Sequence, residues 1–283
     1  MTNPGQLFLV ATPIGNLADI TLRALETLKR VDLIAAEDTR HSRILCQHYQ
    51  ITTPLVSYHQ HNASQRLSFL LEHLQGGKSL ALISDAGMPG IADPGTELVQ
   101  ECITFGIPVV PIPGVSACLT ALVASGLSTE QFIFEGFLPP TEQGRQASIQ
   151  RWQQEQRTII CYEAPHRLLA TLKALAEGLS GSRKLVIARE LTKVHETFWR
   201  GTLGEAVQAW QEQIPKGEFT LVIGGVTEGV VTRSPQELAI EVQQLLDQGL
   251  SLSQACRQVA QIWHLSRQQV YQWYLQESQE AED

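Results

Sequence analysis

Short apolar runs alternate with amphipathic segments along the first half of the chain. The runs LFLVA (7–11), VDLIAA (31–36), LALI (80–83) and PVVPI (108–112) have the length and composition of strands, with LFLVA central in the sheet and LALI buried. Helices are predicted at about 19–29, at 64–74, from 96 to a break at Gly106, and from about 117 to 125. This alternation predicts a mostly parallel sheet with helices on both faces.

The second half repeats the pattern with shorter strands and more polar connections. Strands are expected at 132–134, 158–162, 184–188 and 219–223, with a polar segment through Arg157 and a helix at about 166–176. After Arg233 the pattern is helical, with Ser234 as the cap and Pro235 at the first helical position. We therefore predict two α/β domains, residues 1–126 and 127–231, and a small helical C-terminal module, residues 232–283.

The helical module has the spacing of a helix-turn-helix. Ala260, Leu265, Val270 and Trp273 occupy its core positions and Ser266 caps its second helix, although His264 stands where such motifs usually carry glycine. Its arginines, at 233, 257 and 267, are outnumbered by acidic residues, which argues against duplex DNA binding. An RNA-docking module and a helical packing or dimer module both fit this pattern.

The loop SDAGMPGIADPG (84–95) follows one of the buried strands. Its glycines allow a ligand close to the backbone, and its carboxylates can accept bonds from hydroxyl or ammonium groups. Asp93 and Pro94 are placed to cap and to begin the next helix. An ordinary strand-to-helix connection is the alternative interpretation.

Three other loops, 12–16, 37–43 and 113–117, follow strands of the same sheet and are expected at the same edge. Neither a GxGxxG nor a P-loop motif is present, so the dinucleotide and P-loop classes lack their fingerprints. Small hydroxyls, glycine and aspartate favour a ligand with a ribose, an amine and an apolar part. The turn at Pro113 and Gly114 presents the N–H groups of Ser116 and Ala117 at a helix N-terminus, which suits a carboxylate; a simple turn is the alternative interpretation.

Composition limits the class of protein. Of 283 residues 43% are hydrophobic and 18% charged, as in globular proteins, and neither a membrane span nor a signal peptide is predicted. The net charge of −8 argues against nucleic-acid binding by the whole surface, although Arg40, His41 and Arg43 form a local basic patch. Five scattered cysteines without a CxxC pair predict buried thiols in a cytoplasmic protein without a metal site.

Two polar clusters follow strands of the second half. YEAPHR (162–167) places Tyr, Glu, His and Arg within six residues, and RELTKVHE (189–196) is similarly dense. Local helix capping and a solvated loop with charge pairs would also explain them. Facing the small-residue loops of the first half, the two clusters suggest a cleft between the domains.

Seven segments together resemble the tetrapyrrole methylase superfamily, and within it the branch of small-subunit ribosomal RNA methyltransferases. They are LVATPIGNLADIT (9–21), AAEDTRHSRIL (35–45), SDAGMPGIADPG (84–95), PIPGVSA (111–117), YEAPHRL (162–168), ARELTKVHETFWRGTL (188–203) and KGEFTLVIGG (216–225). The resemblance implies two α/β domains with S-adenosylmethionine in the cleft between them, and a homodimer. It also implies methylation of a cytidine 2'-hydroxyl in the decoding region of 16S rRNA, within the small ribosomal subunit.

The resemblance also assigns residues. Cofactor contacts are expected at Pro13, Asp85, Gly87, Met88, Ser116, Ala117, Ala188, Thr220 and Leu221. For catalysis we expect Glu163 or Glu190 as a base and Lys193 as a cation near the attacking oxygen. Substrate contacts are expected at Arg40, His41, Arg43, His166 and Arg167.

Two rival functions fit parts of this pattern. One is methylation of a tetrapyrrole or another small acceptor, which would need no basic clusters and no helical tail. The other is a non-catalytic regulator that senses S-adenosylmethionine and binds nucleic acid through the C-terminal helices. The acidic tail counts against the regulator.

Overall fold

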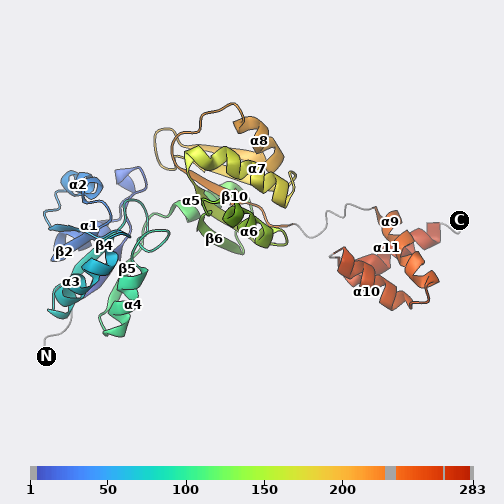
Figure 1. The fold of residues 1–283 in the computed structure, drawn as a ribbon, viewed down its shortest axis with the longest axis horizontal. Helices are drawn as coiled ribbons and strands as arrows, with labels where there is room; N and C mark the ends of the chain where they lie inside the picture. Colours follow the sequence, from blue (N-terminus) through green and yellow to red (C-terminus); the bar gives the residue numbers. More distant parts are fainter. Residues whose placement is uncertain (1–4, 227–233, 264, 281–283) are drawn as a thin grey trace. The chain divides into compact units, whose positions relative to one another are not determined.

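The first half of the chain forms a five-stranded parallel sheet (Figure 1). The computed structural model describes residues 5–226, 234–263 and 265–280. The strand order is β3-β2-β4-β1-β5. The strands are β1 (Leu7–Val10), β2 (Leu33–Ala36), β3 (Leu55–Ser57), β4 (Leu80–Ile83) and β5 (Val109–Ile112).

Helices cover both faces of this sheet because alternate strand side chains point to opposite sides. Phe8 and Val10 join a buried cluster with side chains of α1 and α2. Leu7 and Leu9, which alternate with them along β1, pack instead with side chains of α3 and α4. The elements are the 3-10 helix η1 (Leu17–Asp19), α1 (Leu22–Arg30), α2 (Thr39–His48), α3 (Ala63–Gln75) and α4 (Thr96–Thr104).

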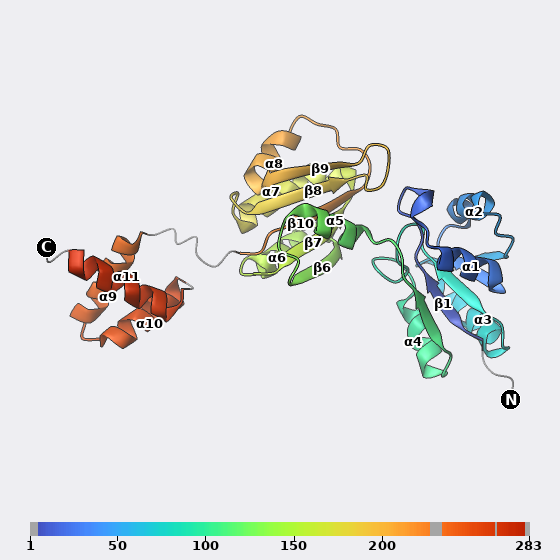
Figure 2. The same cartoon turned by 180° about the vertical axis from the view of Figure 1, so that it is seen from behind.

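The second sheet is mixed, with the order β6-β7-β10-β8-β9 (Figure 2). Only its β6–β7 pair is parallel. Side chains of α6, α7 and α8 pack on one face in a single buried cluster. The elements are β6 (Phe132–Phe137), α6 (Glu142–Trp152), β7 (Thr158–Glu163), η2 (Pro165–Arg167), α7 (Leu168–Leu179), β8 (Lys184–Arg189), β9 (Thr197–Thr202), α8 (Leu203–Trp210) and β10 (Phe219–Ile223).

Helix α5 (Ala117–Ser125) connects the two sheets. It follows β5 of the first sheet, yet its Ala121 and Leu122 are buried against Val186 and Val222 of the second. The domain boundary expected at residue 126 therefore stays a prediction, because α5 precedes this residue in the chain but packs against the second sheet. This packing fixes the N-terminus of α5 beside the strand ends of both sheets.

The C-terminal helices form a separate compact unit, Val226–Asp283. Ala260, Leu265, Val270 and Trp273 share one core, as their spacing predicted. Ser234 caps its helix with Pro235 at the first position, and the Ser266 hydroxyl accepts a hydrogen bond from the Gln269 N–H at 3.1 Å. The helices are α9 (Pro235–Asp247), α10 (Leu252–Ile262) and α11 (Arg267–Glu280). Arg233, His264 and the expected boundary at 231 lie outside the described residues.

Several elements were missed in the sequence. The loop expected at 37–43 is wrong, because α2 begins at Thr39 with Asp38 as its cap. Helix α6 lies in the segment taken as polar, since only Ser148, Ile149 and Trp152 of its residues are buried. Strands β3 and β9 and helix α8 were also not predicted. All five cysteines are buried and unbonded. Over the described ranges, no helix has the length and apolarity to cross a membrane.

Candidate active site

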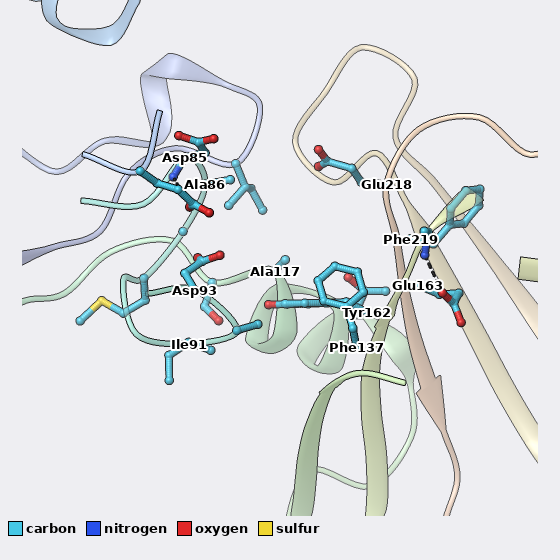
Figure 3. Close-up of a pocket in the computed structure, with 18 of the residues that line it drawn as sticks. Asp85, Ala86, Ile91, Asp93, Ala117, Phe137, Tyr162, Glu163, Glu218 and Phe219 are labelled. Atoms are coloured by element: carbon cyan, nitrogen blue, oxygen red, sulfur yellow. Dashed lines mark hydrogen bonds between the residues drawn. The ribbon is translucent and has the colours of Figure 1, made fainter. Parts of the chain in front are cut away.

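A cavity of about 390 Å³ lies between the two sheets (Figure 3). On one side it is lined by the loop that follows β4 and by the N-terminus of α5. On the other side lie the ends of β6 and β7 and the start of β10. The parallel strands of the first sheet end at this edge, which is where open α/β sheets bind ligands.

One wall of the cavity carries three carboxylates, Glu37, Asp85 and Asp93. The Asp38 N–H donates to Oδ1 of Asp85 at 3.0 Å, and the Asp85 N–H donates to Oε2 of Glu37 at 3.4 Å. Burial raises the pKa of Glu37. Burial, with repulsion from Glu37, raises the pKa of Asp93 to about 6. Carboxylates crowded in this way favour a ligand that brings positive charge.

Asp93 has a different role from the one predicted in the sequence. Helix α4 begins at Thr96 with Gly95 as its N-cap, and no side chain caps it. The Gly95 φ is +150°, and a Cβ built there would lie 2.9 Å from Cδ2 of Leu82. The backbone therefore needs glycine at the cap, and the expectation that Asp93 caps and Pro94 begins the helix is wrong.

Aromatic side chains of the second sheet lie across from the carboxylates. The Tyr162 ring packs edge-on against Phe134 and Phe137, with centroids 4.9 and 5.6 Å away. Its hydroxyl accepts the Cys118 N–H at 3.2 Å, so this ring is tied to the first turn of α5. Burial raises the pKa of Tyr162 to about 12, which keeps the phenol neutral. At the same helix end the Ser116 side chain makes no capping bond.

Most of the residues expected to bind cofactor line this cavity. They are Asp85, Gly87, Met88, Ser116, Ala117 and Thr220. Pro13 lines a neighbouring cavity. Ala188 and Leu221 are fully buried in the two hydrophobic clusters of the second sheet and line neither cavity.

Glu163, expected as a base, is fully engaged in structural contacts. Its side chain is 0% exposed and pairs with Arg167. Oε1 accepts from the Ala164 N–H and from Nε of Arg167, both at 2.7 Å, and Oε2 accepts from the Thr171 hydroxyl at 2.6 Å. Nη2 of Arg167 also donates to the Leu138 carbonyl at 3.0 Å. The network joins β7 to the start of α7, and Glu163 itself lines the cavity.

Glu190 and Lys193 form a second pair near the cavity. Nζ of Lys193 lies 2.9 Å from Glu190 and 3.1 Å from Glu218, which lines the cavity. Burial opposes the charge on Lys193, but its hydrogen bonds to these carboxylates raise its pKa, so it stays cationic. The Lys193 side chain lies across Gly15, where an added Cβ would be 2.4 Å from its Cγ. Lys193 therefore bridges the loop after β1 and the loop after β8.

The expected substrate residues fall in two places. Arg40, His41 and Arg43 are exposed on α2. Arg40 forms a salt bridge of 2.7 Å with Asp38, which holds the pKa of that carboxyl well below its usual range. His166 is exposed, whereas Arg167 is held in the Glu163 network.

Several polar or aromatic residues of the cavity were not assigned to the cofactor from the sequence, among them Glu37, Asp93, Phe137, Tyr162 and Glu218. Glu37 directly follows the predicted strand 31–36, and Tyr162 is the last residue of the predicted strand 158–162. A search for polar residues at strand ends would therefore have found both. Phe137 and Glu218 carry no such signal, because only the packing of the second sheet brings them to the cleft.

Family models and solved structures match this architecture. Residues 6–207 match the family model described as Tetrapyrrole (Corrin/Porphyrin) Methylases, and residues 234–278 match the RsmI C-terminal HTH domain. A uroporphyrin-III C-methyltransferase from Thermus thermophilus, solved in complex with S-adenyl homocysteine, superimposes with a TM-score of 0.58 at 19% identity. The superposition covers 78% of this chain and 98% of that one, and it shows a shared fold.

Relatives with higher identity share nearly the full length. Ribosomal RNA small subunit methyltransferase I of Synechocystis is 56% identical, over 96% of this chain and 98% of the relative. The enzyme of the same name from Escherichia coli O157:H7 is 45% identical, over 96% of each chain. The chain therefore belongs to the tetrapyrrole methylase family and, within it, to the ribosomal RNA small subunit methyltransferase I family.

Proposed function

We propose that this protein transfers a methyl group from S-adenosylmethionine to the 2'-oxygen of a cytidine in the decoding region of 16S rRNA. The observation that carries the proposal is identity of 42–56% to relatives named ribosomal RNA small subunit methyltransferase I, over 95–96% of this chain. The small ribosomal subunit is the proposed substrate particle, and a cytoplasmic homodimer is the proposed active form.

The cavity fits this cofactor by its chemistry. S-adenosylmethionine carries a sulfonium and an ammonium, which match the wall of Glu37, Asp85 and Asp93. Its carboxylate would bind at the N-terminus of α5, at Ser116 and Ala117. Its adenine would lie against Tyr162 and the neighbouring aromatic side chains. When bound, the cofactor supplies an activated methyl group.

The residues of the chain would then position the acceptor and stabilise its oxygen. A ribose hydroxyl is a weak acid, so a cation beside it favours the attacking alkoxide. Lys193 would supply this cation, because it lies between Gly15 and the cavity residue Glu218. Glu190 holds the Lys193 ammonium at 2.9 Å. Glu163, with no free oxygen, would maintain the cavity floor rather than accept a proton.

Methyl transfer to defined acceptors tests the proposal. The purified protein is incubated with methyl-labelled S-adenosylmethionine and one of four samples: naked 16S rRNA, assembled small subunits, a corrin precursor, or no acceptor. We expect label in the subunits, recovered as 2'-O-methylcytidine after nuclease digestion. Label only in the corrin would identify a tetrapyrrole, and not RNA, as the methyl acceptor. Cofactor binding without methyl transfer to any sample would indicate a sensor.

A further inference from the structure

A second cavity, of about 220 Å³, adjoins the cofactor cavity. It is bounded by the loop after β1, by α2 and by the end of β4. Asp85 lines both cavities, so ligands in the two would meet at this residue. Of the residues expected to bind the cofactor, Pro13 and Asp85 line this second cavity and the others do not.

A buried hydroxyl in this cavity has no partner. Ser42 on α2 is 3% exposed, and its Oγ makes no hydrogen bond. The other hydroxyls of the lining are satisfied: Thr12 donates to the Ser84 carbonyl at 3.1 Å, and Ser84 donates to the Gly87 carbonyl at 3.4 Å. Buried polar groups in proteins nearly always have a partner. Of the three hydroxyls of this lining, Ser42 is therefore the one without a partner.

The remaining lining suits a flat heterocycle. Pro13, Leu17 and Leu45 offer apolar contact area, while Ser42 and Asp85 offer polar groups. His41 also lines the cavity, and Arg43 is exposed two residues further along α2. The Arg43 guanidinium would contact a phosphate beside an inserted nucleotide.

We propose that this second cavity receives the base of the target nucleotide, turned out of the RNA, with the Ser42 hydroxyl bonding its polar edge. Enzymes that modify a base extrude its nucleotide into such a pocket, and the same extrusion would expose the ribose to the cofactor. The inserted base would leave its ribose near Asp85 and Lys193, where the cofactor cavity begins. The inference rests on the proposed RNA methyltransferase function and specifies its substrate site.

Two substitutions at one residue test the base pocket. Ser42→Ala removes only the hydroxyl, and Ser42→Leu also fills the cavity. With assembled small subunits we expect kcat/KM to fall about tenfold for Ser42→Ala, as for one lost hydrogen bond, and at least a hundredfold for Ser42→Leu. The Kd for S-adenosylmethionine, by calorimetry, should stay within twofold of wild type for both.

The matched control is Ser148→Ala, because Ser148 is a helical serine that is 4% exposed and lines neither cavity. It should keep wild-type kcat/KM. An unchanged kcat/KM in both Ser42 variants would overturn the base pocket while leaving the RNA function intact. A parallel loss of cofactor affinity would assign the cavity to the cofactor instead. If Ser42→Leu fails to fold, Ser42→Ala decides; a wild type that methylates no RNA refutes the proposed function itself, and the base pocket with it.

Discussion

Removing the Glu163 carboxylate should lower the unfolding free energy of the two-sheet unit strongly, and should affect methyl transfer by the folded protein little. In Glu163→Ala the Arg167 guanidinium, whose side chain is 18% exposed, loses the carboxylate 2.6 Å away. The Ala164 N–H and the Thr171 hydroxyl lose their acceptor as well. Breaking a buried pair on one side costs about 3–5 kcal/mol, because the remaining charge stays buried.

The isosteric Glu163→Gln separates structure from catalysis. The amide oxygen can still accept from Arg167, and the amide N–H₂ can donate to the Thr171 hydroxyl, so we expect a cost of about 1–2 kcal/mol. Because the carboxylate is not available as a base, kcat/KM of the folded protein should stay within about threefold of wild type.

Urea unfolding followed by tryptophan fluorescence measures both costs, and labelled methyl transfer measures activity. The control is Glu155→Ala, which removes a partner of the half-exposed Arg157 and should cost about 1 kcal/mol or less. A loss below 1 kcal/mol in Glu163→Ala would refute the structural role. Full stability of Glu163→Gln with activity lowered a thousandfold would restore Glu163 as the base.

Four further predictions concern other parts of the chain. Because the pKa of Asp93 is raised to about 6, protonation favours the folded state and its contribution is lost as pH rises from about 4 through 6. Asp93→Asn should therefore raise the unfolding free energy at pH 7 by at most about 3 kcal/mol and change it little at pH 4, measured by urea titration at both values. In the wild type, the Kd for S-adenosylmethionine should rise as pH falls below 6, since protonated Asp93 no longer attracts a cation; calorimetry showing a flat profile would contradict the carboxylate wall. Arg183→Ala should cost about 3–5 kcal/mol in the same unfolding assay, because the buried guanidinium donates to the carbonyls of Gly224, Trp152 and Glu155 at 2.6, 2.9 and 2.8 Å. Ser234→Ala should lower the stability of the helical unit alone by about 1 kcal/mol through loss of its capping box, visible as a shift of the C-terminal transition in circular dichroism and absent from the two-sheet unit.

Local sequence signals predicted those strands and helices whose pattern of apolar residues or caps is pronounced. The apolar runs of β1, β2 and β4 predicted buried strands because a parallel sheet covered on both faces needs continuous hydrophobic residues. The run of β5 also predicted a strand, but β5 lies at the edge of the sheet and only its Ile112 is buried. The cap at Ser234 and the helix-turn-helix core at Ala260 and Val270 followed from spacing alone. Helix α6 was not predicted, because its buried face has only three residues. Helix α2 was not predicted either, because its first turn is basic and was interpreted as part of a loop.

By itself the sequence determined the α/β class, the loops at one sheet edge and the family motifs, since each depends on neighbours in the chain. Only the tertiary structure decided what those loops face. Packing of α5 on the second sheet brings Tyr162 and Glu218 to the cavity, although they lie far from Asp85 in sequence. The structure also places Asp93 in the cavity wall and not at the helix N-cap, and it pairs both oxygens of Glu163 with hydrogen-bond donors. Burial, partner geometry and pKa depend on atoms that the fold assembles from distant segments, and no local pattern records them.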